Sequence, residues 1–388
     1  MFFFVAIIML WIIHGYVAWK VIPTLGLSQT QVAIGYLFIF FLSLLPILPI
    51  ILRYAGSETR IIDRISLFGY TSLGFFVLSF LTLFFKDIFV YMINLIGYLI
   101  GNQYLVDDSK REFIKKSLTL SMVGISGVSS SYGFHSSRKG PSIIEQDVYI
   151  NELPNEFENF TIAQISDLHV GPTIKIDYVN KVRKKIGHIN PDLIAVTGDL
   201  VDGSVKHLSK DLQPFKDMIA RYGTYFVTGN HEYYSGVDAW LDETDKLGLT
   251  NLINENRLIS KREEQIAIAG ITDFRAHYIK SSHLSNPEKA IESIEEGMVK
   301  IMLAHQPNSI YSVHEAGVNL QLSGHTHGGQ FWPLTYPTSL ANAYLAGHYD
   351  HNGTQIYVNR GTGYWGPPLR VGVPAEITLI HLKKKVVL

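Results

Sequence analysis

Cysteine is absent from the 388-residue chain, and charged residues are sparse before about residue 105. The lack of cysteine excludes disulfides and thiolate metal ligands, so any metal ion must be bound by histidine, carboxylate or amide groups. It leaves the cellular compartment open. The chain also lacks an excess of charge of either sign, with 33 Lys and Arg against 34 Asp and Glu, and we therefore expect no nucleic-acid partner.

Long apolar runs fill the N-terminal part of the chain. Three of them are long enough to cross a bilayer as a helix, namely Phe2–Ile22, Val32–Leu52 and Ile65–Phe85. A fourth run, Ile88–Leu105, contains three amide side chains and is either a further span or a helix lying in the interface. Together with the weakly hydrophobic run Ser117–Tyr132, these runs predict a transmembrane region of about four to five helices over residues 1–135.

Basic residues indicate which side of the membrane each loop faces. Three arginines between residues 53 and 64 favour a cytoplasmic loop, and so does the basic segment Lys110–Lys116. This segment with the run after it resembles a twin-arginine export signal in which Lys110 replaces the first arginine; the alternative is an ordinary anchoring helix. If Ile88–Leu105 crosses the membrane, the arginine-containing loop and the segment Lys110–Lys116 can both lie in the cytoplasm. The C-terminal part of this multi-pass membrane protein then lies outside the cytoplasm. We favour that arrangement over a cytoplasmic one.

The pattern changes after a short polar linker at residues 136–142. Short apolar strands then alternate with amphipathic helices, as in the predicted strands Phe160–Ser166, Asp192–Thr197 and Thr224–Thr228 and the predicted helices Ile176–Ile189 and Leu212–Tyr222. Arg257–Ser260 and Gln265–Ile271 are typical of an antiparallel pair. The sequence therefore predicts an α/β domain over residues 143–388, an αββα sandwich of two sheets packed face to face between helices.

Five short polar motifs follow predicted strands of this domain. They are Asp167-Leu168-His169, Gly198-Asp199, Gly229-Asn230-His231-Glu232, Ala304-His305 and Gly324-His325-Thr326-His327. In α/β folds, binding sites assemble at the carboxyl ends of strands, so we expect these motifs to converge on one rim.

The residue types in these motifs suit a pair of divalent ions. Two ions about 3.5–4 Å apart need one carboxylate that bridges them and further ligands on each side. Asp199 is the candidate bridge. Further ligands are the carboxylate of Asp167, the amide oxygen of Asn230 and imidazoles, the last from His169, His305, His325 and His327. A two-metal site of this kind hydrolyses phosphoesters.

In order, strand context and residue type, the motifs resemble those of the calcineurin-like metallophosphoesterase superfamily, over roughly residues 157–385. The stretches Gly229–Gly236 and Gly324–Gln330 resemble its bacterial membrane-anchored branch. The resemblance implies one ion, Mn, Fe or Zn, at Asp167, His169, Asp199 and His327, and a second ion at Asp199, Asn230, His305 and His325. It also implies that His231 is catalytic and protonates the leaving group, whereas Glu232 either orients His231 or has no chemical part.

Other residues are candidates for contacts with the substrate. Arg275, His348 and Arg370 are predicted to bind it, the two arginines by pairing with a phosphate. The aromatic segment Phe331-Trp332-Pro333 with Tyr336 and Tyr344 either packs on the core, which we favour, or forms an apolar entrance for a lipid.

Three classes of function follow. The leading hypothesis is a membrane-anchored phosphodiesterase or pyrophosphatase whose substrate is a lipid, either a phospholipid or a nucleotide-linked glycolipid such as UDP-diacylglucosamine. The alternatives are a broad phosphomonoesterase or phosphoprotein phosphatase, which the same site serves, and a non-catalytic membrane sensor that retains the fold. The intact set of ligands argues against the sensor.

Overall fold

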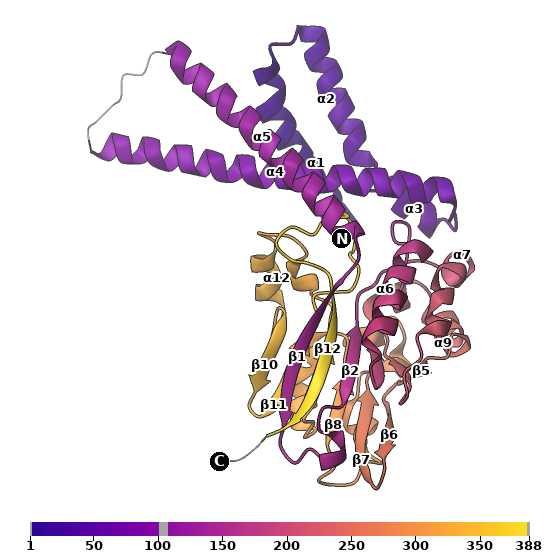
Figure 1. Cartoon of the computed structure of the whole chain (residues 1–388). Coiled ribbons are helices and arrows are strands. Elements are labelled where there is room, and N and C mark those ends of the chain that lie inside the picture. Colours follow the sequence, from indigo (N-terminus) through magenta and orange to yellow (C-terminus); the bar gives the residue numbers. More distant parts are fainter. Residues whose placement is uncertain (1, 101–107, 386–388) are drawn as a thin grey trace. The chain divides into compact units, whose positions relative to one another are not determined.

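The computed structural model describes residues 2–100 and 108–385. It divides into two compact units, which we call the helical unit and the sandwich unit. The helical unit comprises Met1–His135 with Gly366–Leu369, and the sandwich unit comprises Ser136–Trp365 with Arg370–Leu388 (Figure 1).

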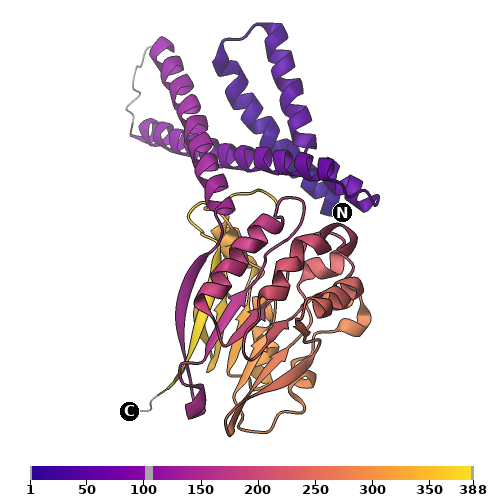
Figure 2. The ribbon, with the colours of Figure 1, turned by 45° about the vertical axis from the view of Figure 1, so that its right-hand side comes forward.

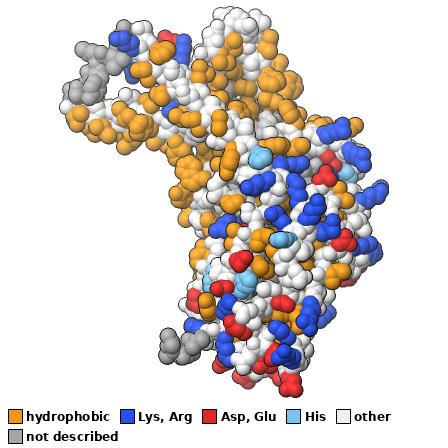
Figure 3. Space-filling view, viewed as in Figure 1, with side chains coloured by type: hydrophobic (Ala, Val, Ile, Leu, Met, Phe, Trp, Pro, Cys, Tyr) orange, Lys and Arg blue, Asp and Glu red, His pale blue; other side chains and the backbone are white. Residues whose placement is uncertain are grey.

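Apolar helices form the helical unit. They are α1 (Phe2–Val21), the 3-10 turn η1 (Ile22–Leu25), α2 (Gln29–Leu44), α3 (Leu48–Tyr54), α4 (Arg60–Leu99) and α5 (Asp108–Arg138), the last of which continues into the sandwich unit. Three helical stretches in the described part of the chain are long and apolar enough to cross a membrane, namely Ile7–Leu25, Gln29–Arg53 and Arg60–Leu99. Hydrophobic side chains cover much of their surface (Figure 3).

The third and fourth apolar runs differ from the prediction, because they form the single helix α4 as far as Leu99. The two predicted runs are separated by Lys86 and Asp87, but the chain stays helical through both residues. The Asp87 carboxylate lies 2.6 Å from Nζ of Lys20 and 2.9 Å from Nζ of Lys86, and it accepts a hydrogen bond from Tyr16. These partners satisfy the charge within the helices, so no break is needed. Residues 101–105 of the fourth run lie outside the described residues.

Two six-stranded sheets form the centre of the sandwich unit. Across the first sheet the order is β1 (Ser142–Ile150), β12 (Glu376–Lys384), β2 (Thr161–Ile165), β3 (Leu193–Val196), β4 (Thr224–Phe226) and β5 (Thr250–Asn251). Across the second it is β10 (Gly347–His351), β11 (Thr354–Val358), β9 (Leu320–Ser323), β8 (Lys300–Leu303), β7 (Glu264–Gly270) and β6 (Glu255–Lys261). Strands β2 to β5 run parallel, as do β11, β9, β8 and β7. The predicted antiparallel pair is confirmed as β6 and β7.

Helices cover the outer face of each sheet (Figures 1 and 2). On the first sheet they include α6 (Ile176–Ile189) and α9 (Val237–Lys246), and on the second α10 (Pro287–Ile291) and α11 (Ile310–Glu315). The unit also contains the short helices α7 (Val205–Leu208), α8 (Asn230–Tyr234) and α12 (Thr335–Ala341), of which α12 buries no residue. The predicted helix over 212–222 is instead the 3-10 helix η3 (Ser209–Asp217), which contains Pro214, a residue that cannot donate an α-helical hydrogen bond.

The side chains of β2 show how the layers pack. Ile162 belongs to the buried cluster between the sheets, with Ile268 and Leu322 of the second sheet. Its neighbour Ala163 points the other way and joins Val182 of α6 in the outer cluster, as alternation along a strand requires. The αββα sandwich is thereby confirmed, with an apolar core that fixes where the strands end.

Candidate metal centre

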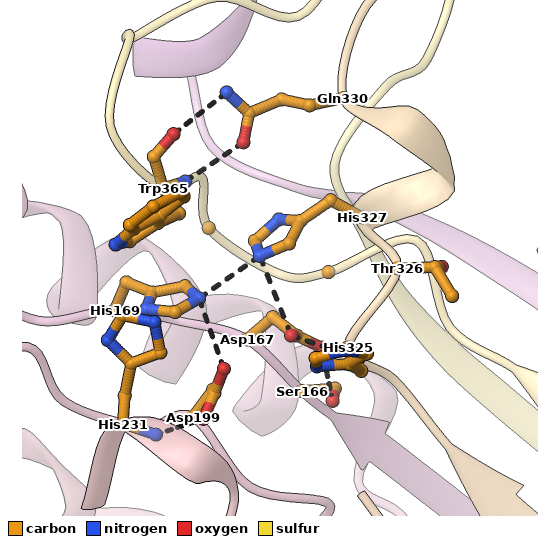
Figure 4. Close-up of polar contacts among 12 residues, drawn as sticks. Ser166, Asp167, His169, Asp199, His231, His325, Thr326, His327, Gln330 and Trp365 are labelled. Carbon is orange, nitrogen blue, oxygen red and sulfur yellow. Dashed lines mark hydrogen bonds and ion pairs between the residues drawn. The ribbon is translucent and has the colours of Figure 1, made fainter. Parts of the chain in front are cut away.

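The predicted motifs lie at the ends of strands from both sheets (Figure 4). The first sheet supplies Asp167 and His169 after β2, Asp199 after β3, and Asn230 and His231 after β4; the second supplies His305 after β8 and His325 and His327 after β9. Residues up to 160 positions apart in the sequence therefore meet at one edge of the sandwich. All of these side chains are buried or half-buried.

Three overlapping groups of donor atoms lie at this edge: Asp167, His169 and His327; His169, Asp199 and His231; and Asp199, His305 and His325. Within each group the donor atoms lie within 4.8 Å of one another. Oδ2 of Asp199 is 3.7 Å from Nε2 of His169 and 3.2 Å from Nε2 of His305. Asp199 thus belongs to the third group and also lies close to His169 of the first, as a carboxylate shared by two ions must.

The backbone at these residues adopts a conformation that side chains rarely allow. Five of the seven predicted ligands have φ between 50° and 71°, namely Asp167, His169, Asp199, His325 and His327. Such left-handed conformations outside glycine are uncommon, and they cluster at functional sites where the surrounding structure holds them. The chain therefore turns sharply just beyond β2, β3 and β9, where these ligands lie.

Glu232 holds the two loops that carry Asp199 and Asn230. Its carboxylate is almost fully buried and accepts hydrogen bonds from four backbone N–H groups, those of Asp199, Leu200, Val201 and Gly229, at 2.6 to 3.3 Å. The N–H of His231 donates in turn to Oδ1 of Asp199 at 2.8 Å. Oδ1 is therefore occupied, and Oδ2 remains to face His169 and His305. A methyl group on Gly229 would lie 2.2 Å from Oδ1 of Asp199, so the loops approach closely only with glycine there.

The substitution Glu232→Gln tests this support. The amide NH₂ of the new glutamine would face backbone N–H groups, which are also donors. Each buried N–H that loses its acceptor costs about 1–3 kcal/mol. We expect the free energy of unfolding to fall by at least that amount and Mn²⁺ affinity to fall roughly 10- to 100-fold, as for other residues that orient metal ligands. Chemical unfolding and Mn²⁺ titration measure the two effects. The exposed Glu296→Gln is the control, and equal behaviour of the two variants would show that Glu232 supports nothing.

Burial favours the neutral form of three of the histidines, whereas at His305 the negative charge of Asp199 outweighs burial and holds the pKa well above its ordinary value. Burial lowers the pKa of His169 to about 3 and that of His325 to about 3, and it holds the pKa of His327 well below its ordinary value. Burial also acts to raise the pKa of Asp199, but His305 and His231 beside it hold that pKa well below its ordinary value. Neutral imidazoles around an ionised carboxylate are the donors that a divalent cation needs.

Two further observations show that these residues fit metal ions. Oδ1 of Asn230 is buried and has no hydrogen-bond partner among the described residues, although buried amide oxygens are almost always paired. Nδ1 of His305 lies 2.8 Å from the carbonyl oxygen of Thr197, and a donor there leaves the lone pair of Nε2 facing the carboxylate of Asp199. A divalent cation held by Asn230, His305 and Asp199 would give each of these atoms a partner.

The predicted substrate contacts lie in three different environments. Arg275 is exposed. The pKa of His325 is lowered mainly by burial, and the positive charge of Arg275 adds to that effect. His348 is exposed on β10 and bonds to Gln355 of the neighbouring strand. Arg370 is 1% exposed, and its guanidinium donates to the carbonyl oxygens of His327, Arg360 and Gly363. Arg370 therefore supports the loop of His327 and does not face the solvent.

The aromatic segment after the last motif is only partly in the core. Phe331 is buried, but Trp332 and Tyr336 are 56% and 64% exposed, so the favoured core packing is wrong for these two. Sequence reasoning also missed Asp202, whose Oδ1 lies 3.3 Å from Nδ1 of His231, and Trp365, whose ring contacts that of His231. Asp202 lies only three residues after Asp199, so its place in the same loop could have indicated that it belongs to the site. Trp365 lies outside all five motifs, and no feature of the sequence around it indicates a place in the site.

Comparisons with known proteins agree with this geometry. A family model described as calcineurin-like phosphoesterase matches residues 160–329. A Danio rerio protein named transmembrane protein with metallophosphoesterase domain is 31% identical over 82% of this chain and 74% of its own length. A Helicobacter pylori protein named uncharacterized metallophosphoesterase is 36% identical over 71% of this chain and 72% of its own length. The uncharacterized metallophosphoesterase YkuE of Bacillus subtilis is 29% identical over 71% of this chain and 98% of its own length.

The buried Asp and His donors, the strand ends that carry them and these similarities lead to one conclusion. The chain belongs to the calcineurin-like metallophosphoesterases, which are metal-dependent phosphoester hydrolases.

Proposed function

We propose that the chain is a membrane-anchored enzyme that hydrolyses a phosphodiester or pyrophosphate bond with two divalent metal ions. The observation that carries the proposal is the position of Asp199 between His169 and His305. We assign one ion to Asp167, His169, Asp199 and His327, and the second to Asp199, Asn230, His305 and His325. Carboxylate, amide and imidazole donors suit Mn²⁺, Fe²⁺ or Zn²⁺.

When bound, the ions supply positive charge to the phosphoryl oxygens and activate water as the nucleophile. His231 is the proposed proton donor to the leaving oxygen. Burial lowers the pKa of His231, but the negative charges of Asp199 and Asp202 outweigh it and raise that pKa to about 9. Of these two carboxylates only Asp202 lies outside the assigned metal ligands, so its charge is the one left to favour the protonated imidazole that a general acid requires. Because Nδ1 faces Asp202, Nε2 remains for the substrate.

The substitution Asp202→Asn tests how His231 is held. Without the carboxylate, the imidazolium is less stable, so its pKa falls and the protonated form is lost at lower pH. We expect kcat to fall roughly tenfold to 100-fold, less than for loss of the acid itself, and the alkaline limb of the pH–rate profile to move to lower pH. A profile that keeps its alkaline limb would contradict the proposed pairing of Asp202 with His231.

The proposed substrate is a lipid. The same chain contains three apolar helical stretches, and these support a substrate that resides in a membrane. The candidates are a phospholipid and a nucleotide-linked glycolipid of the UDP-diacylglucosamine kind. The backbone N–H of the exposed Arg275 donates to Asp273, which also accepts from Gln306, the residue after His305. Arg275 is the proposed contact for a substrate phosphate.

One assay separates the candidate reactions. The full-length chain in detergent, loaded with Mn²⁺, is given bis(p-nitrophenyl) phosphate, p-nitrophenyl phosphate and a lipid-linked nucleotide pyrophosphate. We expect metal-dependent turnover, faster on the diester than on the monoester and fastest on the lipid. Faster turnover of the monoester would favour a phosphomonoesterase or phosphoprotein phosphatase. Bound metal without turnover on any of them would favour a narrow substrate outside these three.

The absence of cysteine makes the side of the membrane measurable. We propose a multi-pass protein of the cell membrane whose sandwich unit faces away from the cytoplasm. A single Glu296→Cys substitution places one reactive thiol at an exposed position of that unit. Labelling by a membrane-impermeant maleimide on intact cells is the expected result. Labelling only after the cells are opened would place the sandwich unit in the cytoplasm.

A further inference from the structure

Two exposed aromatic side chains lie against His231, the proposed proton donor. The ring of Trp365 is 5.5 Å from the His231 ring and that of Tyr234 is 5.4 Å from it, both in edge-on geometry. Trp365 is 50% exposed and Tyr234 is 61% exposed. Large aromatic groups that stay in solvent beside a reactive imidazole are available to a ligand, because they are not used to fill the core.

The backbone of both aromatic residues is tied to segments that carry proposed metal ligands. The side chain of Gln330, three residues after His327, accepts from the N–H of Trp365 at 2.9 Å and donates to its carbonyl oxygen at 3.0 Å (Figure 4). Gln330 itself is only 8% exposed. Tyr234 ends the short helix α8 that begins at Asn230. The backbone that carries each ring is therefore held close to the site.

We propose that Trp365 and Tyr234 form an aromatic subsite that stacks the planar aromatic ring of a phosphoester substrate, such as a nucleotide base. The inference rests on the proposed function and names the kind of substrate that the site takes. An aromatic ring stacks on indole and phenol faces irrespective of its hydrogen-bonding edge. Asp202, which is partly exposed and bonds to the same imidazole, gives the surroundings a polar rim that suits a heteroaromatic ring better than an alkyl chain.

Two ligands that differ only in the base test the subsite. The full-length chain loaded with Mn²⁺ is titrated by calorimetry with uridine 5′-monophosphate and with ribose 5-phosphate. We expect the nucleotide to bind about fivefold tighter or more, which corresponds to base stacking of about 1 kcal/mol or more. Trp365→Ala should abolish this preference and leave ribose 5-phosphate binding unchanged, whereas Trp365→Phe should keep most of it. Tyr234→Ala should reduce it.

The control is Trp332→Ala, a tryptophan of similar exposure that should leave the preference unchanged. Equal affinities of the two ligands in the unmodified chain would overturn the proposal, and so would a Trp365→Ala variant that weakens both ligands equally. Dodecyl phosphate preferred over methyl phosphate through Trp365 would assign the pair to an alkyl chain and likewise overturn it. Failure of the proposed function itself is separate, since it shows as a chain that binds no Mn²⁺ or hydrolyses no diester.

Discussion

Asp199→Asn abolishes metal-dependent hydrolysis, with an expected fall of more than about 100-fold in affinity for Mn²⁺. Residues that merely orient a metal ligand change metal affinity 10- to 100-fold, and a ligand shared between two ions has a larger effect. The substitution keeps the size of the side chain and an oxygen that can accept from the N–H of His231, but it removes the negative charge that faces both histidines. The loss is therefore electrostatic rather than steric.

Mn²⁺ titration and turnover of bis(p-nitrophenyl) phosphate measure this effect on the full-length chain. The matched control is Asp242→Asn, because Asp242 is an exposed carboxylate on α9. Circular dichroism checks that the fold persists in both variants. A variant that binds and turns over like the control would remove Asp199 from the site.

His231→Ala separates chemistry from metal binding. General acid catalysis contributes about 10²–10⁴-fold, so we expect kcat to fall by that range while Mn²⁺ content stays unchanged. The loss should be smaller for a substrate whose leaving group is already acidic, such as p-nitrophenol, than for an alkyl diester, because a good leaving group needs less protonation.

The matched control for His231 is His188→Ala, an exposed histidine at the end of α6. Steady-state kinetics with both substrates, together with metal analysis of each variant, give the comparison. Equal losses on the two substrates, or loss of the metal itself, would show that His231 holds the centre rather than protonating the leaving group.

The sequence predicts the sandwich and the convergence of the motifs because both follow from local patterns. Consecutive apolar residues such as Ile162 and Ala163 mark a strand that is buried on both faces, and polar residues at its end mark the rim. The positive φ of Asp167 and Asp199 leaves no such pattern. It is held by contacts between loops that follow different strands, such as the hydrogen bond from the N–H of Asp199 to Glu232.

Other features depend on partners that are distant in the sequence. Because Glu232 follows His231 directly, the sequence suggests that it orients that histidine. In the structure its carboxylate instead accepts hydrogen bonds from backbone N–H groups more than 30 residues away. Arg370 has the residue type of a phosphate contact, yet it satisfies buried carbonyl groups. Asp87 interrupts an apolar run in the sequence, but Lys20 of another helix pairs with it and α4 continues. Tertiary partners decide each of these cases.

Counting the metal ions that each chain binds tests the central claim most directly. The metal-free, full-length chain is equilibrated with excess Mn²⁺, freed of unbound ions and analysed for metal and protein, beside Asp199→Asn and Asp242→Asn. Our account predicts two ions per chain in the unmodified protein and in Asp242→Asn, and at most one in Asp199→Asn. One ion or none in the unmodified chain, or two ions in Asp199→Asn, would contradict a centre built on a shared Asp199.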